Sequence, residues 1–474
     1  MSNQRPNILV LFTDDQRFDT IAALGNDAVH TPNMDRLVAR GTTFRHAYIM
    51  GGSNAAVCMP SRAMLMTGRY LYHLDGEGQT IPPGHVMLPQ LLRGHGYATC
   101  GIGKWHNSPP AYARAFSTGA EIFFGGMDDH WNVPACDFDP SGQYPAPRPQ
   151  PLDLGVEIVT EQKVFDHVAS GVHSSELFGD AAIDFLRNHD EAAPFMLYVA
   201  FMAPHDPRTM PREFLEMYDP DAIELPPNFM PAHPLDNGEM DVRDEGLAAK
   251  PRDPAEIRRH IAEYYAMISH LDAQIGRVLD TLEETGQAEN TIIVFAGDNG
   301  LALGRHGLMG KQSLYDHSVH VPLILAGPGI PAGAQTDAYA YLLDIYPTLC
   351  DLLGVDTPAS VDGASLVPVL RGTGSGRAQL VFAYRDVQRA LQDDRFKLIE
   401  YCVDGVRTTQ LFDLERDPWE LENLAGDAAH ATRVDAMRAE LRRQWQTVYG
   451  DDRAQGQRFW ACHNAATDLL GGRQ

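Results

Sequence analysis

The chain has 474 residues, of which 44% are hydrophobic, and its 63 acidic and 38 basic side chains give a net charge of −25. This length fits one large domain and a smaller one. The negative charge excludes nucleic acid and anionic membrane surfaces as partners, because both require basic patches.

The N-terminal stretch, MSNQRPNILVLFTDDQ, has no basic segment followed by a long apolar run and a small-residue cleavage site. It therefore lacks the features of a signal peptide. No segment is apolar over the length of a membrane span. These features predict a soluble, cytoplasmic protein.

Five short apolar runs have the composition of strands buried on both faces of a sheet. In chain order they cover residues 7–12, 97–103, 194–202, 291–297 and 321–327. Helical patterns separate them, most clearly over residues 255–285, where apolar side chains recur every three or four positions. This alternation predicts an α/β fold, with a large, mostly parallel sheet sandwiched by helices.

Polar side chains stand directly beyond four of these runs. They are Asp14 and Asp15, Lys104 and His106, His205, and Asp298 and Asn299. In open parallel sheets, ligands bind beyond the carboxyl ends of the strands. The sequence therefore predicts that these side chains converge on one edge of the sheet and form a site there.

A cysteine with unusual neighbours lies in the stretch NAAVCMPSRAMLMTGRY. Pro60 disfavours helical structure in the residue before it and suits the first turn of a helix, while Gly68 is a natural helix end. The pattern predicts extended chain through Cys58 and a helix over residues 60–67. Cys58 then lies just before a helix N-terminus, where an anion is favoured.

The cysteines are scattered, without a C-x-x-C pair or zinc-like spacing. They are Cys58, Cys100, Cys136, Cys350, Cys402 and Cys462. This spacing predicts that most of them are reduced and structural.

The composition changes after about residue 371, where RGTGSGRAQ has the composition of a linker. The segments that follow alternate like a small antiparallel sheet, and a helix is expected over about residues 429–449. We therefore predict a catalytic domain over residues 1–371 and a smaller α+β domain over residues 372–474. The Pro-rich stretch at residues 127–155 predicts a long loop or lid near the site.

The segment CMPSRAMLMTG, residues 58–68, matches the signature C-x-P-S-R-x-x-L-x-T-G, and the chain resembles the type I, formylglycine-dependent sulfatases of the alkaline phosphatase superfamily. Other segments also resemble those of this family and occur in the family's usual order. They include PNILVLFTDDQR, GYATCGIGKWH, APHDP and GKQSLYDHSVHVPLILAGPG. The resemblance covers about residues 7–424. It implies a sulfuric ester hydrolase of the arylsulfatase type.

The resemblance also implies two cofactors. A formylglycine-generating enzyme would oxidise Cys58 to Cα-formylglycine. One divalent cation, Ca²⁺, would be held by Asp14, Asp15, Asp298, Asn299 and the modified residue 58. Oxygen ligands of this kind suit calcium.

The resemblance further implies a role for each remaining polar residue. A hydroxyl of the hydrated aldehyde attacks sulfur, and His205 and Lys311 act as proton donors or charge partners of the leaving oxygen. His106 takes the proton of the second hydroxyl. Lys104 and Lys311 face the sulfate oxygens, and Arg62, one helical turn after Cys58, is expected to reach residue 58 and Asp15.

Two alternatives remain open. The first is a phosphonate monoester or phosphodiester hydrolase of the same superfamily. Those enzymes typically show Asp-Gln after the first strand and Asp-His after the later one, and lack the Lys and His of GKWH. The second is a non-catalytic binding protein, in which at least one of the site residues should have been lost, whereas none is.

We expect the substrate to be a sulfated carbohydrate or a small aryl or alkyl sulfate. Specificity is expected to lie in residues 107–170 and 207–250, and the sequence does not indicate an oligomeric state. Six further polar residues receive no assigned role; the first two are candidates to line the pocket, and the third is a candidate to bind a sugar carboxylate or hydroxyl. They are His130, Trp131, Arg208, His306, His317 and His320.

Overall fold

The computed structural model describes residues 5–153, 158–190, 192–465 and 467–469. An eight-stranded sheet with the order β13-β2-β12-β11-β1-β10-β4-β5 forms its centre. The strands are β1 (Asn7–Thr13), β2 (Gly41–Tyr48), β4 (Ala98–Lys104), β5 (Thr118–Phe123), β10 (Phe195–Ala200), β11 (Thr291–Gly297), β12 (Leu323–Ala326) and β13 (Ala334–Tyr341). Neighbouring strands are parallel, except that β12 runs antiparallel to both β11 and β2.

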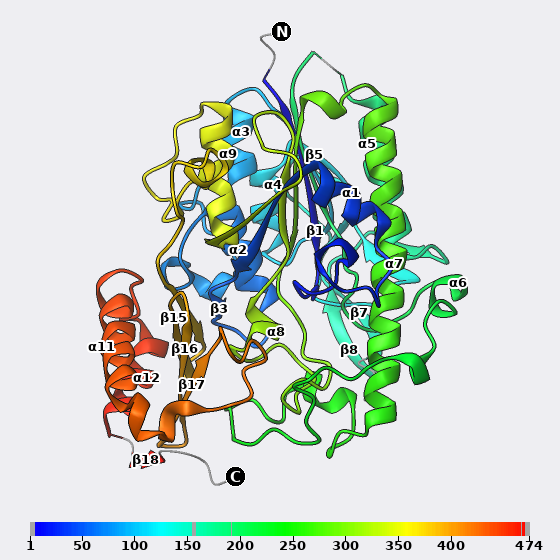
Figure 1. Ribbon diagram of the computed structural model, residues 1–474. Coiled ribbons are helices and arrows are strands. Elements are labelled where there is room, and N and C mark those ends of the chain that lie inside the picture. Colours follow the sequence, from blue (N-terminus) through cyan, green and yellow to red (C-terminus); the bar gives the residue numbers. More distant parts are fainter. Residues whose placement is uncertain (1–4, 154–157, 191, 466, 470–474) are drawn as a thin grey trace.

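Helices cover both faces of this sheet, which confirms the predicted fold class (Figure 1). The helices are α1 (Pro32–Arg40), α2 (Cys58–Thr67), α3 (Leu88–Gly94), α4 (Pro109–Ala115), α5 (Ser174–Asn188), α6 (Arg212–Leu215), α7 (Pro254–Glu284), α8 (Asp316–Val319), α9 (Ile345–Leu353), α10 (Val367–Leu370), α11 (Ala431–Thr447) and α12 (Ala454–Ala465). No helix in the described part of the chain is long and apolar enough to cross a lipid bilayer.

Alternating side chains of β1 enter two separate cores. Val10 and Phe12 pack with side chains of α2, α3, α4 and α9, whereas Leu9 and Leu11 pack with those of α1, α5 and α7. Because both faces of the strand are covered by helices, both sets of side chains must be apolar. This explains why the strands appear in the sequence as unbroken apolar runs.

Helix α7 forms over nearly the predicted range. Asp253 caps its first turn by accepting hydrogen bonds from the backbone N–H groups of Ala255 and Glu256, and Pro254 occupies the first helical position. The expected apolar stripe is buried throughout. It consists of Ile257, Ile261, Tyr264, Ile268, Leu271, Ile275, Val278 and Leu282.

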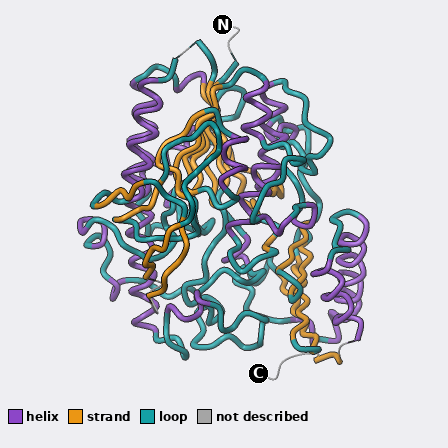
Figure 2. The backbone as a smooth tube through the Cα atoms, turned by 180° about the vertical axis from the view of Figure 1, so that it is seen from behind, coloured by secondary structure: helices purple, strands orange, loops and turns teal. Residues whose placement is uncertain are grey.

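A second sheet lies beside the first and is covered by α11 and α12 (Figures 1 and 2). Its order is β18-β17-β16-β15-β14-β3. The strands are β3 (Gly51–Gly52), β14 (Leu380–Tyr384), β15 (Gln388–Gln392), β16 (Phe396–Val403), β17 (Val406–Asp413) and β18 (Thr467–Leu469). The pairings among β14, β15, β16 and β17 are antiparallel, as expected for this region.

Strand β3 brings a segment from the first part of the chain into this second sheet. Gly51 pairs with Ala383 of β14, and a Cβ atom at Gly51 would lie 2.1 Å from the Ala383 carbonyl oxygen. Its φ of 93° is also in the region that favours glycine. The second sheet therefore contains residues from both sides of the expected boundary at residue 371, and that division stays a prediction.

Three local predictions differ from the structure. Helix α2 begins at Cys58 itself, because Pro60 sits in the first turn, where its missing N–H costs no hydrogen bond. The stretch at 127–155 contains strands rather than only loop, and its last two residues lie outside the described part. These strands, β6 (Asn132–Ala135) and β7 (Arg148–Asp153), each form a two-stranded antiparallel sheet with a later strand, β9 (His167–Ser170) and β8 (Ile158–Lys163) respectively. Helix α12 was not predicted at all.

A disulfide joins Cys402 of β16 to Cys462 of α12, at a sequence separation of 60 residues. The other cysteines are free and buried. The pairing was not predicted, because cysteines so far apart in sequence give no local signal. Disulfides persist mainly in oxidising compartments, so this bond does not support a cytoplasmic location, which stays a prediction.

Replacing Cys462 with serine should reduce the free energy of unfolding by about 3 kcal/mol, because the disulfide restricts the unfolded chain. Thermal or denaturant unfolding of the two proteins measures the difference. A reducing agent should lower the stability of the wild type and leave the Cys462→Ser variant unchanged. Equal stability of the oxidised wild type and the variant would show that the disulfide does not form.

Candidate active site

The site begins where two neighbouring parallel strands end. Strands β1 and β11 finish side by side, so the residues that follow them meet. The backbone N–H of Asp15 donates to Asp298 Oδ1 at 3.0 Å, and Asn299 Nδ2 donates to Asp15 Oδ1 at 2.6 Å. Together with Asp14, these side chains are all buried. The predicted convergence of these four residues is therefore present.

Helix α2 places Cys58 and Arg62 against the same strand ends. Arg62 Nε and Nη2 lie 3.0 and 2.8 Å from Asp298 Oδ2, and Nη2 lies 3.5 Å from Asp14 Oδ2. Ser61 Oγ donates to the carbonyl oxygen of Asp298 at 2.6 Å. The expected contact of Arg62 with Asp15 is wrong, because the first turn of α2 points the guanidinium toward β11 instead.

Strand β4 contributes the next two groups. Lys104 Nζ donates to Asp14 Oδ2, and His106 Nδ1 lies 3.2 Å from Cys58 Sγ. Burial and the charge of Lys104 hold the pKa of His106 well below its ordinary value, so its imidazole is neutral. Burial also raises the pKa of the Cys58 thiol. An unmodified Cys58 is therefore a poor nucleophile in this site.

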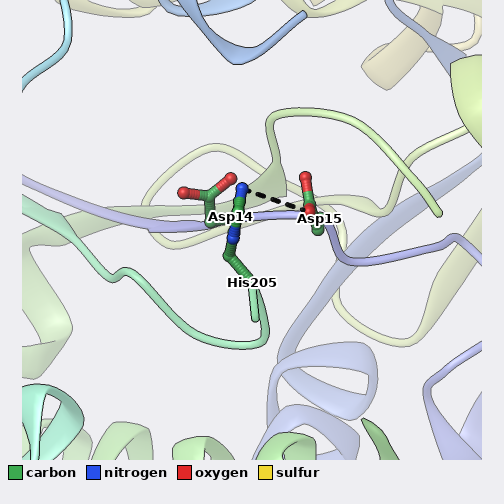
Figure 3. Close-up of side chains that lie close together, drawn as sticks. All are labelled: Asp14, Asp15 and His205. Atoms are coloured by element: carbon green, nitrogen blue, oxygen red, sulfur yellow. Dashed lines mark ion pairs between the residues drawn. The ribbon is translucent and has the colours of Figure 1, made fainter. Parts of the chain in front are cut away.

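The remaining two groups lie near different oxygens of Asp15. Lys311 Nζ donates to Asp15 Oδ1 at 2.5 Å, and His205 Nε2 lies 3.7 Å from Asp15 Oδ2 (Figure 3). Burial works against the charge of Lys311, but Asp15 and its acidic neighbours outweigh it and raise the pKa of Lys311 well above its ordinary value. Lys311 therefore carries a positive charge at neutral pH.

Charges in the site balance in the absence of a metal ion. Three cations face the three carboxylates, and Arg62 lies near both Asp298 and Asp14. The pairs are Lys104 with Asp14, Lys311 with Asp15, and Arg62 with Asp298. A divalent cation would make the site positive by two charges, which explains how a strongly acidic protein could bind an anion at this place.

The residues present fit a hard divalent cation. Asp14 Oδ1 and Asn299 Oδ1 are buried oxygens without a hydrogen-bond partner among the described residues. Atoms of Asp14, Cys58 and Asp298 lie within 4.8 Å of one another, as do atoms of Asp14, Asp15 and His205. Carboxylate and amide oxygens are the ligands that calcium prefers.

The pKa values of Asp298 and Asp14 also favour a bound cation. Burial and the nearby charge of Asp14 raise the pKa of Asp298 to about 6. Burial also disfavours the charge of Asp14, but Lys104 and Arg62 outweigh it and keep that pKa below its ordinary value. A bound cation would favour the ionised form of both carboxylates.

Four of the six residues without an assigned role make contacts that do not include the proposed metal ligands. His130 is fully buried, and its Nε2 donates to the carbonyl oxygen of His205 at 3.0 Å, so it does not line a pocket. Arg208 contacts His260 of α7. His306 stacks on Tyr315, and His320 stacks on Phe18.

Sequence reasoning missed several polar residues next to the site. Tyr264, assigned only to the core stripe, donates its hydroxyl hydrogen to the carbonyl oxygen of Asp15 at 2.6 Å. Gln312, Asp244 and Arg243 form a hydrogen-bonded chain beside Lys311. Only the position of Gln312 next to Lys311 gave a signal in the sequence.

Comparisons with known proteins identify relatives of this chain. The family model described as Sulfatase matches residues 6–355, and a model described as N-sulphoglucosamine sulphohydrolase, C-terminal, matches residues 304–447. A choline-sulfatase of Rhizobium meliloti is 30% identical, over 90% of this chain and 83% of the relative. An N-acetylglucosamine-6-O-sulfatase of Bacteroides thetaiotaomicron is 26% identical, over 95% of this chain and 88% of the relative.

Solved structures show the same fold. One protein, solved in complex with its substrate D-glucosamine-2-N,6-O-disulfate, superimposes with a TM-score of 0.75 at 23% identity, over 95% of this chain and 99% of that chain. The phosphonate monoester hydrolase of Agrobacterium radiobacter superimposes with a TM-score of 0.72 at 24% identity, over 93% of this chain and 96% of that chain. At these identities the likeness supports the fold alone.

Proposed function

The chain belongs to the sulfatase family and is a sulfuric ester hydrolase, and from this premise we propose that it cleaves a sulfate monoester with a formylglycine derived from Cys58 and a bound Ca²⁺. The observation that carries this proposal is the position of Cys58. Its Sγ lies among the carboxylates of Asp14 and Asp298 and 3.2 Å from His106. A modified residue 58 would therefore stand beside both the metal ligands and a neutral base.

Each cofactor supplies one kind of chemistry. Formylglycine supplies a hydrated aldehyde, whose hydroxyl is a nucleophile toward sulfur. Calcium supplies positive charge next to the sulfate oxygens. Asp14, Asp15, Asp298 and Asn299 would hold the ion, because all four follow the ends of β1 and β11 and oxygens of Asp14 lie within 4.8 Å of those of Asp15 and Asp298.

The chain's own cations and histidines would bind the ester and move protons. Lys104 and Lys311 offer positive charge to the sulfate oxygens. His205 Nε2 and Lys311 Nζ both lie next to the Asp15 carboxylate, where they could stabilise the leaving oxygen. His106 is neutral and contacts residue 58, so it can accept a proton from it.

We propose a sulfated carbohydrate or a small aryl or alkyl sulfate as substrate. The names of the relatives support both classes, since one is a sugar 6-O-sulfatase and another a choline-sulfatase. Phosphonate or phosphodiester hydrolysis is the weaker alternative, because Asn299 stands where a metal-binding histidine would be expected. A binding protein without activity is also weaker, since every proposed site residue is retained.

Mass spectrometry of the tryptic peptide that ends at Arg62 tests the proposal. The protein should be made with and without a co-expressed formylglycine-generating enzyme, the expected modifying partner. We expect a lighter, hydrazide-reactive peptide only with that enzyme, and release of inorganic sulfate from aryl and sugar sulfates only by the modified protein. Sulfate release by a protein whose Cys58 is still a thiol would contradict the proposed nucleophile. A modified protein that cleaves phosphonates but no sulfate ester would contradict the proposed reaction.

A further inference from the structure

Four polar side chains, linked in series by hydrogen bonds, lie next to His205 and Lys311. They are Gln312, Asp244, Arg243 and Asp206, and we call this set the outer network. Its members come from three separate segments, namely the residues after β10, the short helix η5 (Arg243–Leu247) and the residues after Lys311. None of the four is among the proposed metal ligands.

Gln312 forms one end of the outer network and uses both parts of its amide. Its Oε1 accepts a hydrogen bond from the backbone N–H of Lys311 at 2.9 Å. Its Nε2 donates to the carbonyl oxygen of Ala55 at 3.1 Å and to Asp244 Oδ2 at 2.8 Å. Because Ala55 stands three residues before Cys58, this one buried side chain connects the nucleophile segment to the Lys311 segment.

Arg243 joins the middle of the network to its far end. Its Nη1 donates to Asp244 Oδ1 at 3.0 Å and to Asp206 Oδ1 at 2.9 Å, and its Nη2 donates to Asp206 Oδ2. This two-point contact between a guanidinium and a carboxylate fixes orientation as well as distance. Only 5% of the Asp206 side chain is exposed, so the pair is little weakened by solvent.

The last step leads from Asp206 to His205. His205 Nδ1 lies 2.8 Å from the carbonyl oxygen of Asp206. A carbonyl oxygen can only accept, so Nδ1 must carry a hydrogen, and Nε2 is the atom that faces Asp15. The network thus ends at the group that sets both the tautomer and the direction of His205.

We propose that the outer network positions His205 and Lys311 relative to residue 58, and thereby determines how well the enzyme expels poor leaving groups. This inference rests on the proposed function, in which these two residues serve the leaving oxygen. Proton donation matters most when the leaving alcohol is weakly acidic. An activated phenol needs little such help, so misplacing the donors should affect it far less.

The Asp244→Asn variant tests the proposal with two substrates. Asparagine keeps the size of the side chain but has only one acceptor oxygen for the donors on Gln312 and Arg243. We expect kcat/KM for an unactivated alkyl or sugar sulfate to fall about 10²-fold, the cost of an ångström-scale misplacement. The value for 4-nitrophenyl sulfate should change little. Asp241→Asn is the matched control, since it removes an equal charge from an exposed position on the same segment.

Two results for this variant would overturn the proposal. One is an equal loss for both substrates, which indicates general damage to the site. The other is no loss for either substrate. If Asp244→Asn does not fold, Gln312→Met removes the same connection from its other end and should give the same preference for the activated ester.

Hydrogen exchange of the unmodified, inactive protein provides a test that needs no activity. Asp244→Asn should accelerate amide exchange in residues 203–210 and 310–313, and Asp241→Asn should not. Unchanged exchange in both segments would contradict the proposed role of the outer network, whether or not residue 58 acts as proposed. Conversely, a wild type that cleaves neither ester while the exchange responds as expected would refute the proposed function and leave the network standing.

Discussion

Replacing Cys58 with alanine should lower the rate of sulfate release by at least about 10⁵-fold, a loss of the size found when the nucleophile of a hydrolase is removed. Alanine cannot be oxidised to an aldehyde, so the remaining groups can only orient the ester and a water molecule. The change removes one contact, that of Sγ with His106. Initial rates of sulfate release and thermal unfolding of the purified variant measure the two effects, and the unfolding temperature should stay close to that of the wild type.

Cys100→Ala is the matched control for this experiment. Cys100 is likewise a free, buried cysteine, but it lies within β4 and contacts none of the proposed site residues through a described hydrogen bond. That variant should keep its activity. A Cys58→Ala protein with a rate near that of the wild type would show that residue 58 does not attack sulfur.

Removal of divalent cations should have the second largest effect. Chelation should lower the rate about 10³-fold, because a metal ion contributes several kcal/mol of charge stabilisation in the transition state. Added calcium should restore the rate and raise the unfolding temperature, since it binds the folded site. As Asp298 has a pKa of about 6 without the ion, protons should compete with calcium, and the affinity should fall as the pH drops through 6. Calorimetric titration at several pH values measures this.

Two aspartate variants separate the metal site from general charge effects. Asp298→Ala should abolish the stabilisation by calcium, whereas Asp280→Ala, which removes an exposed carboxylate of α7, should retain it. Calcium that raises the unfolding temperature of both variants equally would place the ion elsewhere. Full activity after complete chelation would contradict a role for any cation.

The central sheet and the long helix could be predicted because their signals are local. Residues 292–297 are apolar throughout and form most of β11, which is buried on both faces. The three- or four-residue spacing of Ile257, Ile261 and Tyr264 becomes the buried stripe of α7. The sheet determines where residues at the ends of such strands lie. The proximity of Asp14 and Asp298 could therefore also be predicted.

Other features depend on contacts between segments far apart in sequence. Arg62 turned toward Asp298 rather than Asp15 because the side-chain direction depends on how α2 packs, which no periodicity reveals. Arg243 lies in a short helix that shows no motif in the sequence, and only the folded chain brings it to Asp206. The disulfide between Cys402 and Cys462 could not be predicted for the same reason.

The position of β3 has a consequence for the order in which the site is made. Gly51 and Gly52, just before the nucleophile segment, pair with Ala383 and Tyr384. On the ribosome, the first pair leaves the exit tunnel long before the second. The segment that leads to Cys58 therefore lacks its strand partner until most of the chain has been translated, so one of the first parts of the active site to be synthesised is among the last to be held in place.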